Sequence, residues 1–213
     1  MFLMLTYAGA HVANLPDATA PSGQGRIDPS NITFKAVSSG IGLIINIWVF
    51  FRVSGSVFNP AVTLALVIVR AIPPIRGILY CIAQLVGAIC AAAIVRGLMP
   101  GPLGCATRLG GGANIAQGKA ACAENYIKRI GLFLEMFLTA QLMFVIFMLA
   151  VEKHKSTFLA AFGIGLAVIV AQMVGIYYTG ASLNPARTLG PDVIVGFPGY
   201  HWIYCISISQ DCS

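Results

Sequence analysis

The chain has 213 residues, of which 58% are hydrophobic and 9% are charged, and its mean hydropathy is +0.84. Because soluble domains carry about 25% charged residues, this composition excludes an ordinary soluble domain and indicates an integral membrane protein. The formal net charge of +6 does not indicate a nucleic-acid partner, since the basic residues are spread over short polar segments and form no basic stripe.

The first half of the chain predicts a shortened span, a full span, a half-helix and a second full span. Residues 1–15 are apolar but fall short of the roughly 20 residues that a spanning helix requires. Residues 16–35 are polar and predict a loop, and residues 36–51 predict a span. The apolar run at 62–72 is too short to cross the bilayer, so it predicts a re-entrant half-helix before the span at 75–95.

The second half of the chain repeats this order after a long polar segment. Residues 96–129 predict an exposed loop, and residues 130–151 and 158–178 predict full spans. A second half-helix is expected to end at about Val195, and the apolar residues at 200–208 are too few for a complete final span. We therefore expect both outer spans to be shortened.

One ten-residue pattern occurs in both halves, and the spans are arranged around it. Residues 55–64 have the sequence GSVFNPAVTL and residues 180–189 have the sequence GASLNPARTL, so six of ten positions are identical. The two Asn-Pro-Ala boxes start at positions 59 and 184, which are 125 residues apart. Two copies in matching apolar surroundings indicate an internal duplication rather than two unrelated turns.

Each Asn-Pro-Ala box predicts the start of a helix. Proline has a fixed φ and no N–H, so it suits the first helical position and keeps the residue before it out of the α region. That asparagine becomes an N-cap whose carbonyl oxygen accepts from the first turn, which leaves its NH₂ group free to donate elsewhere. The alanine of each box keeps the approach to the asparagine amide narrow. The residues of the two boxes are Asn59, Pro60, Ala61, Asn184, Pro185 and Ala186.

The duplication also predicts how the two halves lie in the membrane. Each half contains three spans, an odd number, so the copies must have opposite orientations and their half-helices must enter from opposite faces. The helix N-termini then meet at the bilayer midplane, where their positive dipole ends and the two amides converge. This predicts a pore constriction within one channel domain, residues 1–213, made of repeat 1 at about 1–97, a loop at 98–129 and repeat 2 at about 130–213.

The chain resembles the aquaporin, or major intrinsic protein, family over nearly its whole length. The resemblance rests on the paired boxes, on Thr179-Gly180 before the second box and Arg187 after it, and on the segments GLFLEMFLTAQ at 131–141 and GYHWIY at 199–204. The segment at 131–141 is most similar to fungal members. The resemblance implies an all-α membrane bundle of six spans, the first and last shortened, plus two re-entrant half-helices. It also implies a homotetramer in the lipid bilayer with one pore per protomer and no cofactor or metal.

The same resemblance implies a passive channel for water, with glycerol, urea and peroxide as further small neutral solutes. A water molecule at the centre would accept from Asn59 and Asn184 at once, so its own hydrogens would point away and no proton wire could cross in one orientation. Cations would be opposed by the converging helix dipoles and by Arg187, while the apolar lining offers nothing to replace an ion's hydration shell. Ions and protons are therefore expected to be excluded.

The resemblance places Arg187 in the selectivity filter of the pore. Counting from the two boxes puts the other filter positions at Ser39, Gln172 and Ala181. These residues differ from the aromatic side chain and the histidine of a strict water filter, so a wider and less discriminating mouth is expected. Thr188 also stands where the small-solute branch of the family usually has an aspartate. Water remains the leading substrate.

Glu135 is the only acidic residue well inside a predicted span. Ionisable residues at such depth are costly, so they mark structural or functional positions. The resemblance implies that Glu135 braces the loop before the second half-helix rather than transferring protons. A secondary transporter, which also uses inverted repeats, would be expected to carry several carboxylates at mid-membrane. One carboxylate therefore favours a channel.

Two other classes of function compete with the channel. An enzyme is not indicated, because no Ser/His/Asp set, phosphate loop or metal-ligand spacing is present and the three histidines lie in unrelated segments. A truncated, non-conducting member of the family is the open alternative, because both outer spans are expected to be shortened. In either case the sequence predicts a multi-pass protein of the plasma membrane or of an internal membrane.

Overall fold

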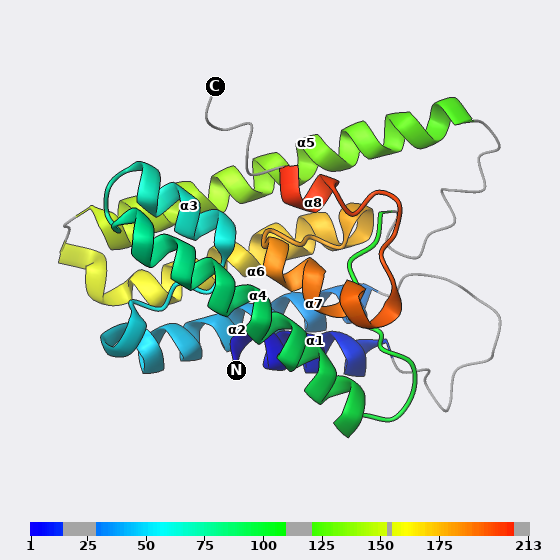
Figure 1. The fold of residues 1–213 in the computed structure, drawn as a ribbon, viewed down its shortest axis with the longest axis horizontal. Coiled ribbons are helices and arrows are strands. Elements are labelled where there is room, and N and C mark those ends of the chain that lie inside the picture. The colour runs from blue at the N-terminus through cyan, green and yellow to red at the C-terminus, as the bar shows by residue number, and fades with distance from the viewer. Residues whose placement is uncertain (15–28, 110–120, 153–154, 207–213) are drawn as a thin grey trace.

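The computed structural model describes residues 1–14, 29–109, 121–152 and 155–206, and every regular element in these ranges is a helix (Figure 1). The elements in chain order are α1 (Phe2–Ala13), α2 (Pro29–Ser54), α3 (Pro60–Ile68), α4 (Pro74–Leu98), α5 (Ala121–Ile146), a π-helical turn (Phe147–Val151), a 3-10 turn (Lys155–Leu159), α6 (Ala160–Thr179), α7 (Pro185–Val195) and α8 (Ile203–Ile206).

Helices of membrane length make up most of the described chain. Large apolar side chains on them face outward, as on α4, where Ile75 is 76% exposed. An outward apolar surface on a helix whose backbone groups are bonded internally suits contact with lipid. The protein is therefore an integral multi-pass membrane protein, and the prediction of an all-α membrane fold is confirmed. The four segments that are long and apolar enough to span are Pro29–Ser54, Pro74–Leu98, Lys128–Val151 and Thr157–Thr179.

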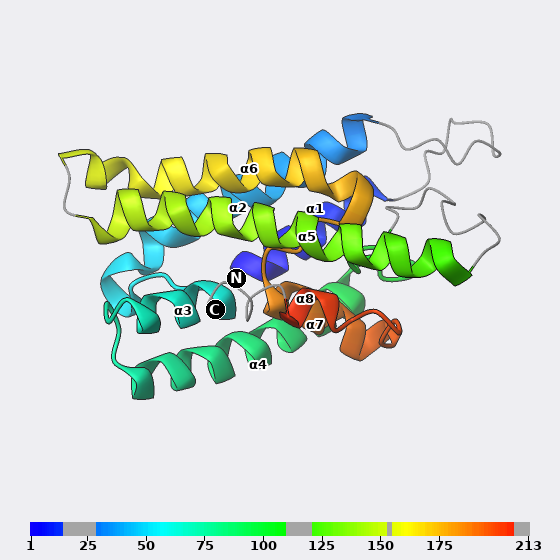
Figure 2. The same cartoon turned by 90° about the horizontal axis from the view of Figure 1, so that it is seen from above.

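The helices lie in two groups, and the two short helices α3 and α7 belong to the same group. Figure 2 shows α1, α2, α5 and α6 along one side and α3, α4 and α7 along the other. α2 and α6 cross closely, because a Cβ on Gly40 would lie only 2.7 Å from the carbonyl oxygen of Gly165. α3 and α7 lie end to end alongside α4, and hydrogen bonds join the loops that lead into them (Figure 2).

Several helix boundaries differ from those predicted, and three of the differences are informative. α2 begins at Pro29 instead of residue 36, because proline suits a first turn and the polar residues after it can face outward. α3 ends at Ile68 instead of residue 72, where Arg70 turns the chain with a left-handed φ of 60°. α5 begins at Ala121 instead of residue 130. Polar residues thus made the predicted α2 and α5 too short, since a helix can continue beyond the apolar part of the membrane, whereas α3 was predicted too long.

Part of the segment at 99–109 is folded into the protein, because Leu103, Cys105 and Thr107 are buried while residues 100–102 and Arg108 are exposed. Cys105 and Thr107 are only 4% and 2% exposed, and burial raises the pKa of the Cys105 thiol to about 12. His11 of α1 holds this segment: the amide of Gly104 donates to Nδ1 at 3.3 Å, so Nε2 donates to the carbonyl of Pro100 at 3.0 Å. The prediction of an exposed loop is wrong here. Of the rest of that predicted loop, residues 96–98 and 121–129 are helical, in α4 and α5, and residues 110–120 lie outside the described residues.

Candidate functional site

Both boxes form the helix starts that their residues predict. Asn59 has extended backbone and its Oδ1 accepts from the amide of Ala61 at 2.9 Å. Asn184 has the same conformation, and its Oδ1 accepts from the amide of Ala186 at 3.0 Å. In each case proline occupies the first helical position. The local chemistry of asparagine followed by proline thus favours a helix start at both boxes.

The duplication extends to the backbone before each box. Gly55 and Ser56 have left-handed φ values of 74° and 56°, and the matching residues Gly180 and Ala181 have values of 80° and 44°. A left-handed φ is unfavourable for serine and alanine, so surrounding contacts must hold both residues there. The two loops therefore share an unusual conformation at their first two residues, but they differ directly before the asparagine, where Leu183 has a left-handed φ of 55° and Phe58 does not.

The two boxes are joined through their side-chain amides. Nδ2 of Asn59 donates to the carbonyl of Leu183 at 2.7 Å, and Nδ2 of Asn184 donates to the carbonyl of Phe58 at 3.0 Å. The NH₂ groups thus donate away from their own helices, as expected, and one hydrogen of each binds the backbone directly before the opposite box. Since an amide NH₂ carries two hydrogens, one on each asparagine remains to donate elsewhere.

Arg187 is buried beside the second box with 6% of its surface exposed. Its Nη1 donates to the carbonyl of Gly180 at 3.0 Å and also to the carbonyl of Ala181. From the other side, the hydroxyl of Tyr7 in α1 donates to the carbonyl of Arg187 at 3.0 Å. The Nε of Arg187 has no hydrogen-bond partner among the described residues. Nη1 thus fixes the position of the guanidinium, while Nε keeps a hydrogen unused by the described residues.

Of the other three predicted filter residues, Ala181 contacts Arg187 directly, whereas Ser39 and Gln172 share a cavity with it. Gln172 and Ser39 line the same cavity as Arg187, and Nε2 of Gln172 donates to the hydroxyl of Ser39 at 3.1 Å. Oε1 of Gln172 has no partner within the described part of the chain. Ala181 is fully buried and contributes its backbone carbonyl to Arg187. The wall therefore carries one unpaired acceptor and one unpaired donor.

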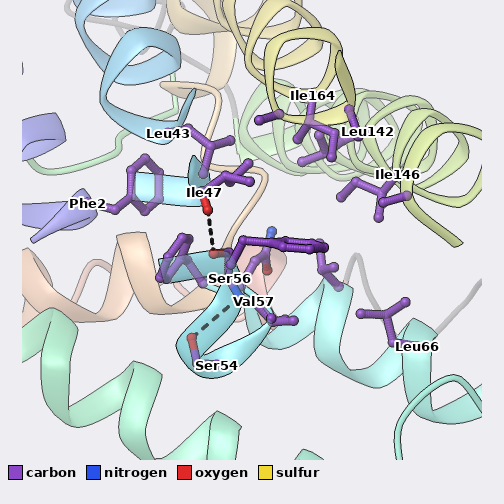
Figure 3. Close-up of a pocket in the computed structure, with 18 of the residues that line it drawn as sticks. Phe2, Leu43, Ile47, Ser54, Ser56, Val57, Leu66, Leu142, Ile146 and Ile164 are labelled. Atoms are coloured by element: carbon purple, nitrogen blue, oxygen red, sulfur yellow. Dashed lines mark hydrogen bonds between the residues drawn. The ribbon is translucent and has the colours of Figure 1, made fainter. Parts of the chain in front are cut away.

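One cavity of about 790 Å³ reaches this wall from the far end of α2. It runs from Phe51 and Arg52, near the end of that helix, to Asn59, Asn184 and Arg187. Between these ends its lining is mostly apolar, as Figure 3 shows. The apolar side chains labelled there are Phe2, Leu43, Ile47, Val57, Leu66, Leu142, Ile146 and Ile164.

Glu135 of α5 is 1% exposed and its carboxylate is used by the loop before the second box. Oε1 accepts from the hydroxyl of Thr179 at 2.6 Å and from the amide of Ser182 at 2.9 Å, and Oε2 accepts from the amide of Leu183 at 3.0 Å. Bonds from amides to a charged acceptor are stronger than those to a neutral one. Glu135 therefore holds this loop on two successive backbone amides.

Some contributors to the site were not predicted. Gln84 of α4 donates to the carbonyl of Val57 at 2.8 Å, and Tyr204 of α8 donates to the carbonyl of Thr179 at 2.7 Å. Together with Tyr7, these side chains hold the loops and the first turn of α7 from outside. Gln84 and Tyr7 could have been noticed as polar groups inside apolar runs, although that signal does not say which backbone groups they bind.

Comparisons with known proteins agree with this geometry. The family model described as Major intrinsic protein matches residues 1–207. The chain is 47% identical over 212 residues to Aquaporin-7 of Botryotinia fuckeliana, covering 97% of this chain and 43% of that protein. It is 45% identical over 206 residues to Aquaporin-1 of Gibberella zeae, covering 97% of this chain and 60% of that protein. The chain thus spans about half the length of these curated relatives.

A solved structure shares the fold. The X-ray structure of the aquaglyceroporin from Plasmodium falciparum matches with a TM-score of 0.69 and 20% sequence identity, covering 97% of this chain and 86% of that one. At this identity the likeness concerns the fold alone. It confirms the predicted aquaporin-like arrangement of spans and short helices.

Proposed function

This chain belongs to the major intrinsic protein family, whose members are membrane channels and not enzymes, and from that premise we propose that it forms a passive channel for water. One observation carries the proposal. Asn59 and Asn184 each bind the backbone of the opposite box while both line a single cavity. Two amide groups held at one point of a pathway can orient each passing water in the same way.

Exclusion of ions and protons follows from electrostatics in this proposal. α3 and α7 direct their N-termini toward each other, so the positive ends of two helix dipoles meet at the boxes. Arg187 adds a full positive charge in the same wall. The apolar lining offers few groups that could replace the hydration shell of a cation, and desolvating an ion without such groups is very unfavourable.

Small neutral solutes other than water are part of the proposal. Ser39, Gln172 and Arg187 place a hydroxyl, an amide and a guanidinium group in the wall of the cavity, and groups of these kinds can exchange hydrogen bonds with a passing hydroxyl or amide. Neither Ser39 nor Gln172 supplies an aromatic ring that would narrow the pathway. Glycerol, urea and peroxide are therefore further candidate solutes, and a homotetramer with one pore per protomer, in the plasma membrane or an internal membrane, completes the proposal.

Osmotic shrinkage of proteoliposomes containing this chain tests the channel, first for water and then for glycerol. We expect shrinkage several-fold faster than that of empty vesicles. Ser39→Trp fills the buried wall beside Gln172 and should return the rate to the empty-vesicle level, whereas Thr33→Trp, on the exposed first turns of α2, should not. Shrinkage no faster than in empty vesicles would reject the channel and favour a non-conducting family member.

A further inference from the structure

We propose that Thr107 is a positioning residue for Arg187 and thereby helps to set the selectivity of the pore. The proposal rests on the proposed function, but it concerns a residue outside both boxes, in the segment that connects the two halves of the chain. Thr107 is 2% exposed and lies against the loop that leads into α7. Two sets of contacts link it to the backbone around Arg187.

The first set is a directed chain of hydroxyl groups. Each hydroxyl has one hydrogen to donate. Ser182 uses its hydrogen on the carbonyl of Asn184, at 2.8 Å, so the hydrogen between Ser182 and Thr188 must come from Thr188. Thr107 in turn donates to the hydroxyl of Thr188 at 2.9 Å. The chain that starts at Thr107 therefore ends on the backbone of the cap residue of the second box.

The second set is backbone packing behind the carbonyls that hold Arg187. A Cβ on Gly180 would lie 3.1 Å from Cα of Thr107 and 3.1 Å from the amide nitrogen of Arg108. The carbonyl groups of Gly180 and Ala181 are the acceptors for Nη1 of Arg187. Because the segment touches this loop directly, a displacement of Thr107 would move the acceptors as well.

Removing the hydroxyl of Thr107 would disturb the first turn of α7. Thr188 is fully buried, so without Thr107 its oxygen would keep no donor from the 99–109 segment. A buried polar group that loses its partner is unfavourable, so the remaining hydroxyls would rearrange. The amides of Arg187 and Thr188 both bind the carbonyl of Asn184, at 3.0 and 3.3 Å, and would shift with that rearrangement.

Hydrogen–deuterium exchange of the protein in lipid nanodiscs tests the positioning role without relying on transport. Thr107→Val removes the hydroxyl and keeps the shape of the side chain. It should speed exchange in residues 180–188 by about tenfold, because these amides lose part of their local stability. Residues 55–64 should be unchanged. Unchanged exchange at 180–188 would overturn the proposal, whatever the transport assays show.

Two further variants serve as controls for this experiment. Thr107→Ser keeps the donor and should exchange within about twofold of the parent, since the hydrogen bond is retained. Thr33→Val removes a hydroxyl that donates to Pro29 within the first turn of α2, at 2.9 Å, and should leave 180–188 unaffected. If Thr107→Val does not fold, Thr107→Cys takes its place, because a thiol is a weak donor.

Selectivity is the second measurement. In proteoliposomes, Thr107→Val should raise the ratio of cation leak to water permeability several-fold, and Thr107→Ser should restore the parental ratio. A loss of folded protein would lower both rates and leave their ratio unchanged, so an unchanged ratio in a water-conducting Thr107→Val overturns the proposal. If the parent chain conducts no water, the proposed function fails and the exchange experiment alone decides the role of Thr107.

Discussion

At the scale of single residues, the site depends on how buried polar atoms divide their hydrogen bonds. Asn59 uses its oxygen for its own helix and one hydrogen for the opposite box, and Asn184 does the same. Their orientations are therefore fixed from both ends, with one hydrogen left on each. Arg187 is held through Nη1, while its Nε remains without a partner among the described residues. Unpaired buried donors are unfavourable unless a ligand or water satisfies them.

Arg187→Ala tests the role of this charge. Removing it should raise the leak of small cations or protons through proteoliposomes by about tenfold or more, since a barrier lowered by about 1.4 kcal/mol gives a factor of ten. Water permeability should be retained. Arg129→Ala, which removes an exposed arginine from α5, should leave the leak at the parental level. If Arg187→Ala still excludes cations and protons, Arg187 is not part of the selectivity filter.

At the scale of the elements, the loops before the two half-helices are held by side chains with opposite hydrogen-bonding roles. Gln84 holds the first loop by donating to the carbonyl of Val57. Glu135 holds the second loop by accepting from two amides, those of Ser182 and Leu183. A duplicated loop can therefore keep its shape while its support changes from a neutral donor to a charged acceptor, because loop backbone offers both amides and carbonyls.

Glu135→Gln should destabilise the protein. The substitution removes the charge and turns one acceptor into a donor that would face an amide. We expect the free energy of unfolding to fall by about 1.5–3 kcal/mol, the usual range for hydrogen bonds to a charged group. Unfolding in detergent by heat or denaturant measures the change. Glu152→Gln alters an exposed carboxylate after the π-helical turn and should have little effect. Equal stabilities of the two variants would contradict the bracing role.

At the scale of the whole molecule, α4 and α5 present large apolar side chains outward. On α4 Ile75 and Leu79 are 76% and 61% exposed, and on α5 Phe137 is 68% exposed. Such surfaces can contact lipid or a neighbouring copy of the chain, and both environments remove them from water. A bundle with apolar sides and a mostly apolar cavity is consistent with the channel family to which the chain belongs.

For the whole molecule we predict assembly as a homotetramer. Native mass spectrometry from a mild detergent should give a main species with four chains of 22.5 kDa each. Chemical cross-linking in membranes should give a ladder that ends at the same size. A single-chain species that persists in both experiments would reject the tetramer, and the proposed pore within each protomer could still be tested by osmotic shrinkage.

The amino-acid sequence alone was enough to predict the features that depend on neighbouring residues. Asparagine followed by proline determines the N-caps at Asn59 and Asn184, because both the capping bond and the restricted φ involve residues adjacent in the chain. Long apolar runs likewise determined the full spans, since a span needs only length and hydropathy.

The tertiary structure decided what those local features contact. Nothing near Asn59 indicates that its amide binds Leu183, and nothing near Thr107 indicates that its polar segment is buried. A polar segment can be buried only where other elements satisfy its hydrogen bonds, as His11 and Thr188 do here. Those partners are distant in sequence, so only the assembled fold determines which side chains hold the loops around Arg187.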